Sequence, residues 1–139
     1  MSAIDGLQSA LGGEYAAVYG YEVTAAKSDG DLRASLVRAL NVHRANRDAL
    51  RARIVAQGAD PVAAEPAYVV PDVSTSTRAR AFATAMEQRM GVTYAQLISE
   101  PDADTRTIGL NGLRDSTIRA AGWSGIVQDL PGIQQPSAR

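Results

Sequence analysis

The sequence contains no cysteine, which excludes disulfide bonds, thiolate zinc sites and thiol catalysis. It also lacks any apolar run near the roughly 18 residues that a membrane-spanning helix needs. Its first residues show no basic region followed by an apolar one. The net charge of −1 creates no global field that would attract nucleic acid or an anionic membrane. We therefore expect a cytoplasmic protein that binds neither nucleic acid nor a membrane.

Aromatic residues and histidine are scarce, and the familiar catalytic motifs are missing. Aromatics make up 5% of the chain and there is one histidine, whereas apolar residues make up 45%. A core built mainly from Ala, Leu, Val and Ile suits closely packed helices. No glycine-rich phosphate loop is followed by Lys, and a Ser-His-Asp arrangement would have only His43 to use. The 139 residues suffice for one domain with its own core. We predict a single all-α domain over residues 1–139 and favour a protein that is not an enzyme.

Apolar residues in alternating steps of three and four predict a bundle of helices. Four helices are expected, at about residues 2–27, 31–57, 74–99 and 104–123. Ser2 and Asp5 form a capping signature for the first helix. Asp31 is the expected cap of the second helix and Asp102 or Asp104 that of the fourth.

The segment 58–75 breaks the helical pattern, because Pro61, Pro66 and Pro71 favour stiff, extended chain. Such a segment spans up to about 56 Å at 3.3 Å per residue, whereas a helix of about 26 residues is roughly 39 Å long. It can therefore cross the full length of the bundle, so that the third helix starts at the same end as the second. We expect Tyr68, Val69 and Val70 to pin this crossover to the helices. Residues 124–139 are expected to form an extended tail, packed back by Ile126, Leu130 and Ile133.

Ionisable residues interrupt the apolar seams of the first two helices. The first seam reads Ile4, Leu7, Leu11, Glu14, Val18, Tyr21 and Ala25. The second reads Leu36, Leu40, His43, Arg47, Leu50 and Ile54. A buried carboxylate or imidazole is unfavourable unless a charged or protic group meets it. Glu14, His43 and Arg47 are therefore predicted to converge in the interior.

The other two helices add fewer inward polar groups. Phe82, Met86, Met90, Thr93 and Leu97 form the expected stripe of the third helix, with Glu87 and Tyr94 one step to the side. Ile108, Leu110, Leu113, Thr117, Ala120 and Ala121 form that of the fourth helix, which Gly109 and Gly112 are expected to loosen.

Several local strings resemble an actinobacterial ferritin-like family of unknown function. They are residues 14–21, which look like its E-x-A-A-x-Y-x-Y opening, and residues 43–50, which look like its H-R-x-x-R-D-x-L segment. Further matches are Pro66-Ala67-Tyr68, Met86-Glu87 before Tyr94-Ala95, and Trp123 with the later Leu-Pro-Gly-Ile. The resemblance implies a ferritin-like four-helix bundle with a long crossover between helices two and three. It implies no assigned activity.

The ferritin-like superfamily builds a di-iron site from a Glu on the first and third helices and Glu-x-x-His on the second and fourth. Carried over to this chain, the pattern gives Glu14, His43 and Glu87. Leu40 stands where the second helix should supply Glu. The fourth helix has neither Glu nor His, and Asp115 is its only carboxylate past the first turn.

Two interpretations of the site remain open on the sequence. In the first, Glu14, His43, Arg47, Glu87 and Tyr94 form a buried polar cluster in place of a lost di-iron site, and the protein has a structural or interaction role. Tyr21 and Asn46 could complete its hydrogen bonds. In the second, Glu14, His43 and Glu87 hold a single divalent metal such as iron or manganese for an oxidoreductase or iron-handling protein. A small-ligand site in the polar interior is a third possibility.

We also expect a homodimer, because ferritin-like bundles commonly pair through their first two helices. Tyr15, Tyr19 or Val42 could lie on such a face, and Gly12 and Gly13 could permit close approach. The sequence identifies no other protein partner.

Overall fold

The structure is a computed structural model that describes residues 2–127 and 129–133. It contains α1 (Ala3–Ala26), α2 (Gly30–Ala56), α3 (Ser76–Ala95), the short 3-10 helix η1 (Gln96–Ser99) and α4 (Ala103–Ser124). The described residues include no strand. Within the same residues, every helix is too short or too polar to cross a bilayer. The predicted all-α four-helix bundle is confirmed.

The ends of the helices follow from local hydrogen bonding. Ser2 and Asp5 form the predicted capping box at the start of α1, each side chain bonding to the other residue's backbone N–H. Asp102 caps α4 through its carboxylate. The prediction for α2 was wrong by two residues, because Asp29 occupies the cap position instead of Asp31. Asp29 makes no side-chain capping bond.

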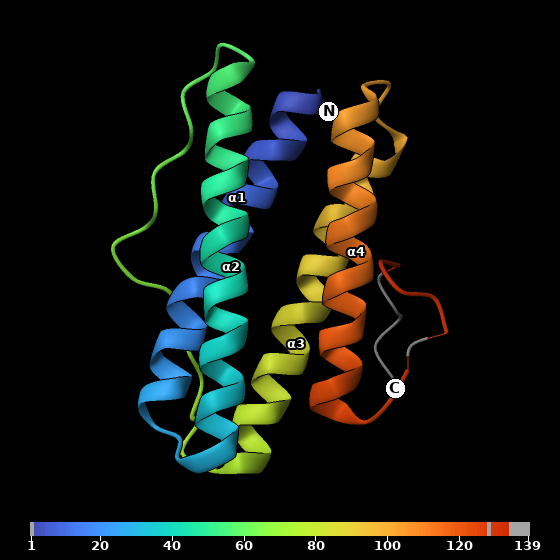
Figure 1. The fold of residues 1–139 in the computed structure, drawn as a ribbon. Helices are drawn as coiled ribbons and strands as arrows, with labels where there is room; N and C mark the ends of the chain where they lie inside the picture. The colour runs from blue at the N-terminus through green and yellow to red at the C-terminus, as the bar shows by residue number, and fades with distance from the viewer. Residues whose placement is uncertain (1, 128, 134–139) are drawn as a thin grey trace.

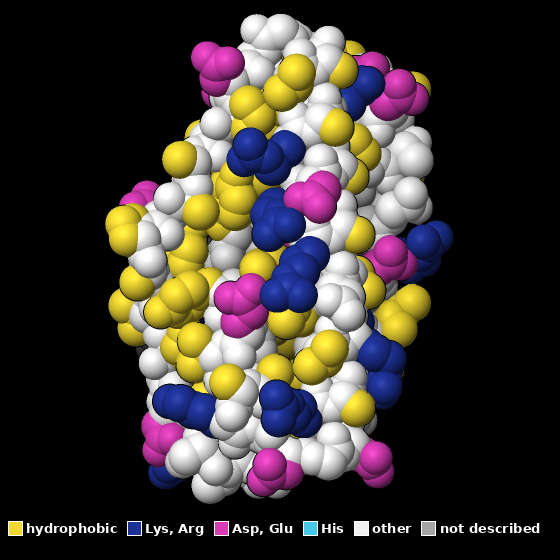
Figure 2. All heavy atoms as spheres, turned by 60° about the vertical axis from the view of Figure 1, so that its left-hand side comes forward, with side chains coloured by type: hydrophobic (Ala, Val, Ile, Leu, Met, Phe, Trp, Pro, Cys, Tyr) yellow, Lys and Arg dark blue, Asp and Glu magenta, His cyan; other side chains and the backbone are white. Residues whose placement is uncertain are grey.

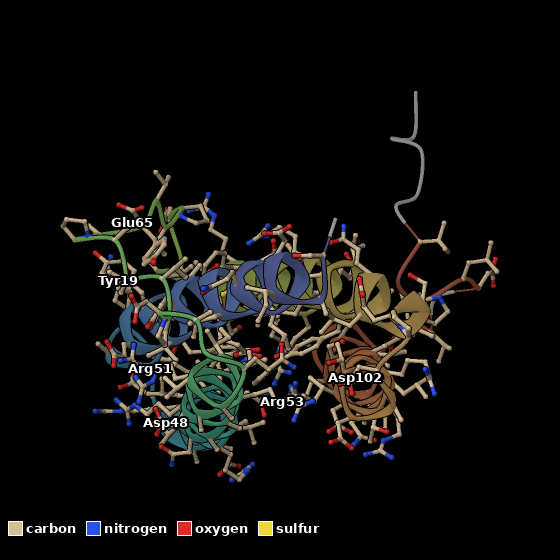
Figure 3. All side chains as sticks on the ribbon, turned by 90° about the horizontal axis from the view of Figure 1, so that it is seen from above. Tyr19, Asp48, Arg51, Arg53, Glu65 and Asp102 are labelled. Carbon is tan, nitrogen blue, oxygen red and sulfur yellow. The ribbon has the colours of Figure 1, made fainter. Side chains whose placement is uncertain are left out.

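The crossover has the predicted path. In Figure 1, α1 descends, α2 rises, the crossover returns along the outside, and α3 rises before α4 descends. Helix α1 packs against α2 and α3, and α3 packs against α4. Seen from above, α1 and α3 form one layer while α2 and α4 form the other (Figure 3). An ion pair joins Arg53 of α2 to Asp102, the cap residue of α4, with 2.8 Å between Nη2 and Oδ2 (Figure 3).

Side chains from α1 hold the crossover in place. Gln8 donates a hydrogen bond to the carbonyl of Asp60 and accepts one from the N–H of Val62. The rings of Tyr19 and Tyr68 lie 5.6 Å apart between centroids. The expectation for Val69 was wrong, because its side chain is 97% exposed. Polar contacts to the crossover backbone therefore replace part of the expected apolar packing.

Most predicted seam residues of α1 and α2 are buried, with Arg47 an exception, whereas the predicted seam of α4 is only partly correct. Helix α4 buries small or polar residues, namely Thr105, Gly109, Ser116 and Ala120. Leu110, which was expected in the core, is 52% exposed. The small residues let α4 lie close against α3, while Ile108 and Trp123 still pack on the edges of the core and Ile118 is exposed.

The C-terminal segment departs from its expected packing. Helix α4 continues through Ser124 and ends at Gly125, whose φ of 74° is left-handed. Ile126, Leu130 and Ile133 are more than half exposed. Residue 128 and residues 134–139 of the expected tail lie outside the described residues.

One face of the molecule is basic. Figure 2 brings forward the side that carries the crossover and α2, and shows Lys and Arg side chains in a column with acidic groups among them. Six arginines belong to α2. Acidic partners neutralise part of this positive charge. Glu22 pairs with Arg44, and Asp48 pairs with Arg47.

Candidate functional site

The imidazole of His43 lies between two buried carboxylates. Its Nδ1 is 2.5 Å from Oε2 of Glu14 on α1, and its Nε2 is 2.7 Å from Oε1 of Glu87 on α3. Glu14 and His43 are fully buried, and Glu87 is 1% exposed. Three helices thus bring their inward ionisable groups to one point at the centre of the bundle.

Neutral donors complete the shell around Glu14. The Tyr94 hydroxyl donates to Oε1 of Glu14 over 2.6 Å, and the Asn46 amide donates to the same oxygen over 3.2 Å. Each oxygen of this carboxylate is therefore hydrogen-bonded.

Glu87 gathers its donors on a single oxygen. Oε1 of Glu87 accepts from the Tyr21 hydroxyl over 2.7 Å and from Nε of Arg119 over 3.0 Å, besides its contact with His43. Nε1 of Trp123 donates in turn to the Tyr21 hydroxyl over 3.1 Å. Oε2 of Glu87 is buried without a hydrogen-bond partner among the described residues.

The two carboxylates determine the protonation state of His43. Burial by itself would lower the pKa of His43, but hydrogen bonds to Glu14 and Glu87 and their negative charges outweigh burial and raise this pKa to about 9. At neutral pH the ring is therefore an imidazolium that donates from both nitrogens. Burial opposes ionisation of Glu87 too, yet His43 and Arg119 hold its pKa below the ordinary value.

The buried charges balance. With both carboxylates ionised, Glu14 and Glu87 carry two negative charges, and His43 and Arg119 carry two positive ones. Burial is the largest cause raising the pKa values of Tyr21 and Tyr94, so both remain neutral hydrogen-bond donors. These four groups together then leave no net charge in the low-dielectric interior.

The structure brings together Glu14, His43, Glu87 and Tyr94, but it places Arg47 elsewhere. The prediction that Arg47 would meet Glu14 or Glu87 was wrong, because its guanidinium donates to Asp48 at the surface. Arg119 supplies the internal positive charge. Asp115 is likewise turned outward, paired with Arg114.

The inward position of Arg119 is encoded in the spacing of small residues along α4, and a search for apolar residues alone misses it. One face of α4 approaches α3 or the site, and its residues are spaced in steps of four and three. They are Thr105, Gly109, Gly112, Ser116, Arg119 and Trp123. This spacing is the one that placed Glu14 and His43 inward. Because most members are small, apolar spacing alone does not reveal this seam.

The contacts around His43 disfavour the predicted single divalent metal. A metal-ligating imidazole must be neutral, whereas both ring nitrogens of His43 here contact carboxylates, one on Glu14 and one on Glu87. The fourth helix contributes a guanidinium, which repels a cation. Among the described residues, no group of three or more His, Asp or Glu side chains is arranged to hold a metal ion.

Part of the expected pairing face is already covered. Tyr15 is 9% exposed and donates through its hydroxyl to the Val62 carbonyl of the crossover. Tyr19 packs on Tyr68. Gly13 faces Met90, whose sulfur would lie 2.8 Å from an added Cβ, so this glycine serves packing within the chain. Val42 remains 40% exposed.

These features define a class, namely a four-helix bundle with a long crossover between α2 and α3 and a neutral Glu-His-Glu-Arg network at its centre. Residues 6–135 match the family described as "Domain of unknown function (DUF4439)", and the chain belongs to this family. The chain is also similar to the crystal structure of a conserved hypothetical protein from Mycobacterium tuberculosis. That match has a TM-score of 0.82 and 28% sequence identity, and covers 88% of this chain and 96% of the other. No curated protein matches.

Proposed function

We propose that this chain is a ferritin-like bundle in which an internal ion-pair network has replaced a di-iron centre. Its role is then structural or one of interaction, without catalysis. The observation that carries the proposal is the position of His43, which donates from both ring nitrogens to two different carboxylates. Arg119 supports it, since its guanidinium contributes positive charge from the helix that should hold the remaining metal ligands.

The enclosure of the network agrees with a role in the fold. Glu14 and His43 are fully buried, so a substrate does not reach them from solvent without opening the helices. The net stabilisation by such a network is small, because desolvation offsets the attraction between the charges. Its contribution lies in the arrangement of the helices, since a shifted helix would leave a buried charge without a partner.

Metal analysis tests this proposal. The protein is purified without an affinity tag or chelator, and bound iron, manganese and zinc are measured by mass spectrometry for the wild type, Glu14→Ala and His43→Ala. We expect metal far below one ion per chain in all three. A stoichiometric metal in the wild type that either substitution removes would refute the replacement of the metal centre.

The competing candidate is a metal-binding oxidoreductase or iron-handling protein that uses Glu14, His43 and Glu87. One observation favours it. Oε2 of Glu87 is buried and has no hydrogen-bond partner among the described residues, and an unpaired carboxylate oxygen attracts a cation. For His43 to become a ligand it would have to lose a proton and one of its carboxylate contacts. The same metal analysis decides between the two candidates.

A further inference from the structure

A pocket opens between α2 and α4 beside the buried network. Its volume is about 440 Å³, within the range of small-molecule sites. Helices α2, α3 and α4 all contribute to its lining, and the residues that matter here are Arg38, Val42, Arg80, Ile118, Arg119 and Trp123. It is separate from the carboxylates and imidazole of the network, which it approaches only through Arg119 and Trp123.

The charge lining this pocket is of one sign. Arg38, Arg80 and Arg119 come from three different helices, and no Asp or Glu belongs to the lining. Among the described residues, Arg38 and Arg80 form no ion pair with a carboxylate. Arg38 donates only to Ser35, over 2.8 Å. Two positive charges therefore face the pocket without compensation, which is favourable for an anion.

Arg119 is held in place for binding. Its Nε donates inward to Glu87, while Nη1 and Nη2 make no other hydrogen bond within the described residues. The side chain is 19% exposed, so these two nitrogens reach solvent on the pocket side. A guanidinium fixed on one edge by a carboxylate presents its other donors with little loss of rotamer freedom.

The remaining wall is apolar. Trp123 lines the pocket together with Val42 and Ile118, which are 40% and 64% exposed. The guanidinium of Arg80 lies 6.0 Å from the centre of the Trp123 ring, a distance that permits a cation–π interaction. The pocket therefore combines an aromatic and aliphatic wall with converging cationic donors.

We propose that this pocket binds a small organic anion. A carboxylate or phosphate group accepts hydrogen bonds from Arg38, Arg80 and Arg119, and an apolar or planar body lies against Trp123 and the neighbouring aliphatic side chains. Arginine suits this role because its planar donors match the geometry of both anionic groups. The site does not depend on the metal centre having been replaced, so either outcome of the metal analysis leaves it intact.

The single tryptophan provides the assay. Because Trp123 is the only tryptophan of the chain, the emission comes from one side chain that lines this pocket, and the variants below test whether a change in it arises from the pocket. The full chain is titrated with benzoate, phenyl phosphate, benzyl alcohol and inorganic phosphate at constant ionic strength. Calorimetry and the shift in melting temperature provide independent readouts. We expect saturable binding of benzoate, phenyl phosphate or both, which identifies the preferred anionic group, and weaker binding of the two controls.

Three single-charge variants locate the binding. Arg38→Gln and Arg80→Gln should each lower the affinity for the more tightly bound aromatic anion about fivefold. This is the effect expected for loss of one charge-assisted contact near solvent. Arg33→Gln is the matched control, because Arg33 is exposed on the same helix α2 but outside the pocket lining. It removes the same charge and should leave the affinity unchanged.

Three results would overturn the proposal. The first is no saturable binding of either aromatic anion at millimolar concentration. The second is benzyl alcohol or inorganic phosphate binding as tightly as the aromatic anions. Either the anionic group or the apolar body of the ligand would then contribute nothing to the affinity. The third is an equal loss of affinity in Arg33→Gln, which would mean that only the general charge of α2 acts.

Discussion

At the residue scale, Arg119 and Arg47 form a natural pair for comparison. Both are arginines in a helix, but Arg119 binds buried Glu87 whereas Arg47 binds Asp48 at the surface. Arg119→Met should lower the free energy of unfolding by about 3 kcal/mol, because it leaves a buried carboxylate undercompensated. Arg47→Met should change it by less than about 1 kcal/mol. Urea denaturation of the two variants measures both values, and equal effects would contradict the assignment of Arg119.

The raised pKa of His43 makes stability depend on pH. Its pKa is about 9 in the folded chain against 6.5 as the ordinary value, so the folded state binds the proton more tightly than the unfolded state. The resulting stabilisation is complete below about pH 6.5 and is lost as the pH rises through 9. A shift of this size corresponds to roughly 3 kcal/mol.

Denaturation at pH 6, 7.5 and 9.5 measures this dependence. The free energy of unfolding of the wild type should fall steadily across this range. His43→Gln should lack that fall, since it has no group that titrates there in the network. A wild type equally stable at pH 6 and pH 9.5 would show that the imidazole is not protonated in the fold.

At the element scale, the glycines of α4 decide how closely two helices approach. A Cβ added at Gly112 would lie 2.2 Å from the ring of Tyr94, and Tyr94 must occupy that place to reach Glu14. Gly112→Ala should therefore destabilise the fold by about 1–3 kcal/mol through overpacking. Gly122, on the same helix, has nothing within 4 Å of an added Cβ. Gly122→Ala should instead stabilise by about 0.5–1 kcal/mol, because alanine favours the helix.

Thermal unfolding of these two variants distinguishes a glycine needed for close packing from one that only lowers helix propensity. Opposite changes in melting temperature are expected, downward for Gly112→Ala and upward for Gly122→Ala. If both changes are upward, Gly112 loosens the helix as the sequence indicated, and the close packing of Tyr94 on α4 is wrong.

At the scale of the whole molecule, assembly remains a prediction. We propose a homodimer, and the contacts of the crossover with Tyr15 and Tyr19 leave Val42 as the most exposed of the three side chains expected on the pairing face. Light scattering at tens of micromolar should give twice the chain mass. Val42→Glu should shift the protein towards the monomer, because a carboxylate would be buried in the interface. A wild type that remains monomeric would refute the dimer.

Local spacing and chain length are enough to predict the helices, the crossover and most of the network. Apolar spacing identified the inward faces of α1 and α2, and the polar exceptions in those seams, Glu14 and His43, could only be buried together. Proline spacing and the length of the crossover fixed its path, because an extended chain of that length spans the bundle. These features depend on local periodicity and chain length, which a sequence records directly.

The identity of the arginine in the network and the orientation of α4 follow from how the helices pack and not from local spacing. Arg47 and Arg119 both lie at seam spacing, and a long flexible side chain can turn either inward or towards solvent. The choice depends on which partner lies closer once the helices are packed, here Asp48 for Arg47 and Glu87 for Arg119. The seam of α4 was hidden for the same reason: small residues carry little hydrophobic signal, and their function is to admit a neighbouring side chain that only the packed structure brings near.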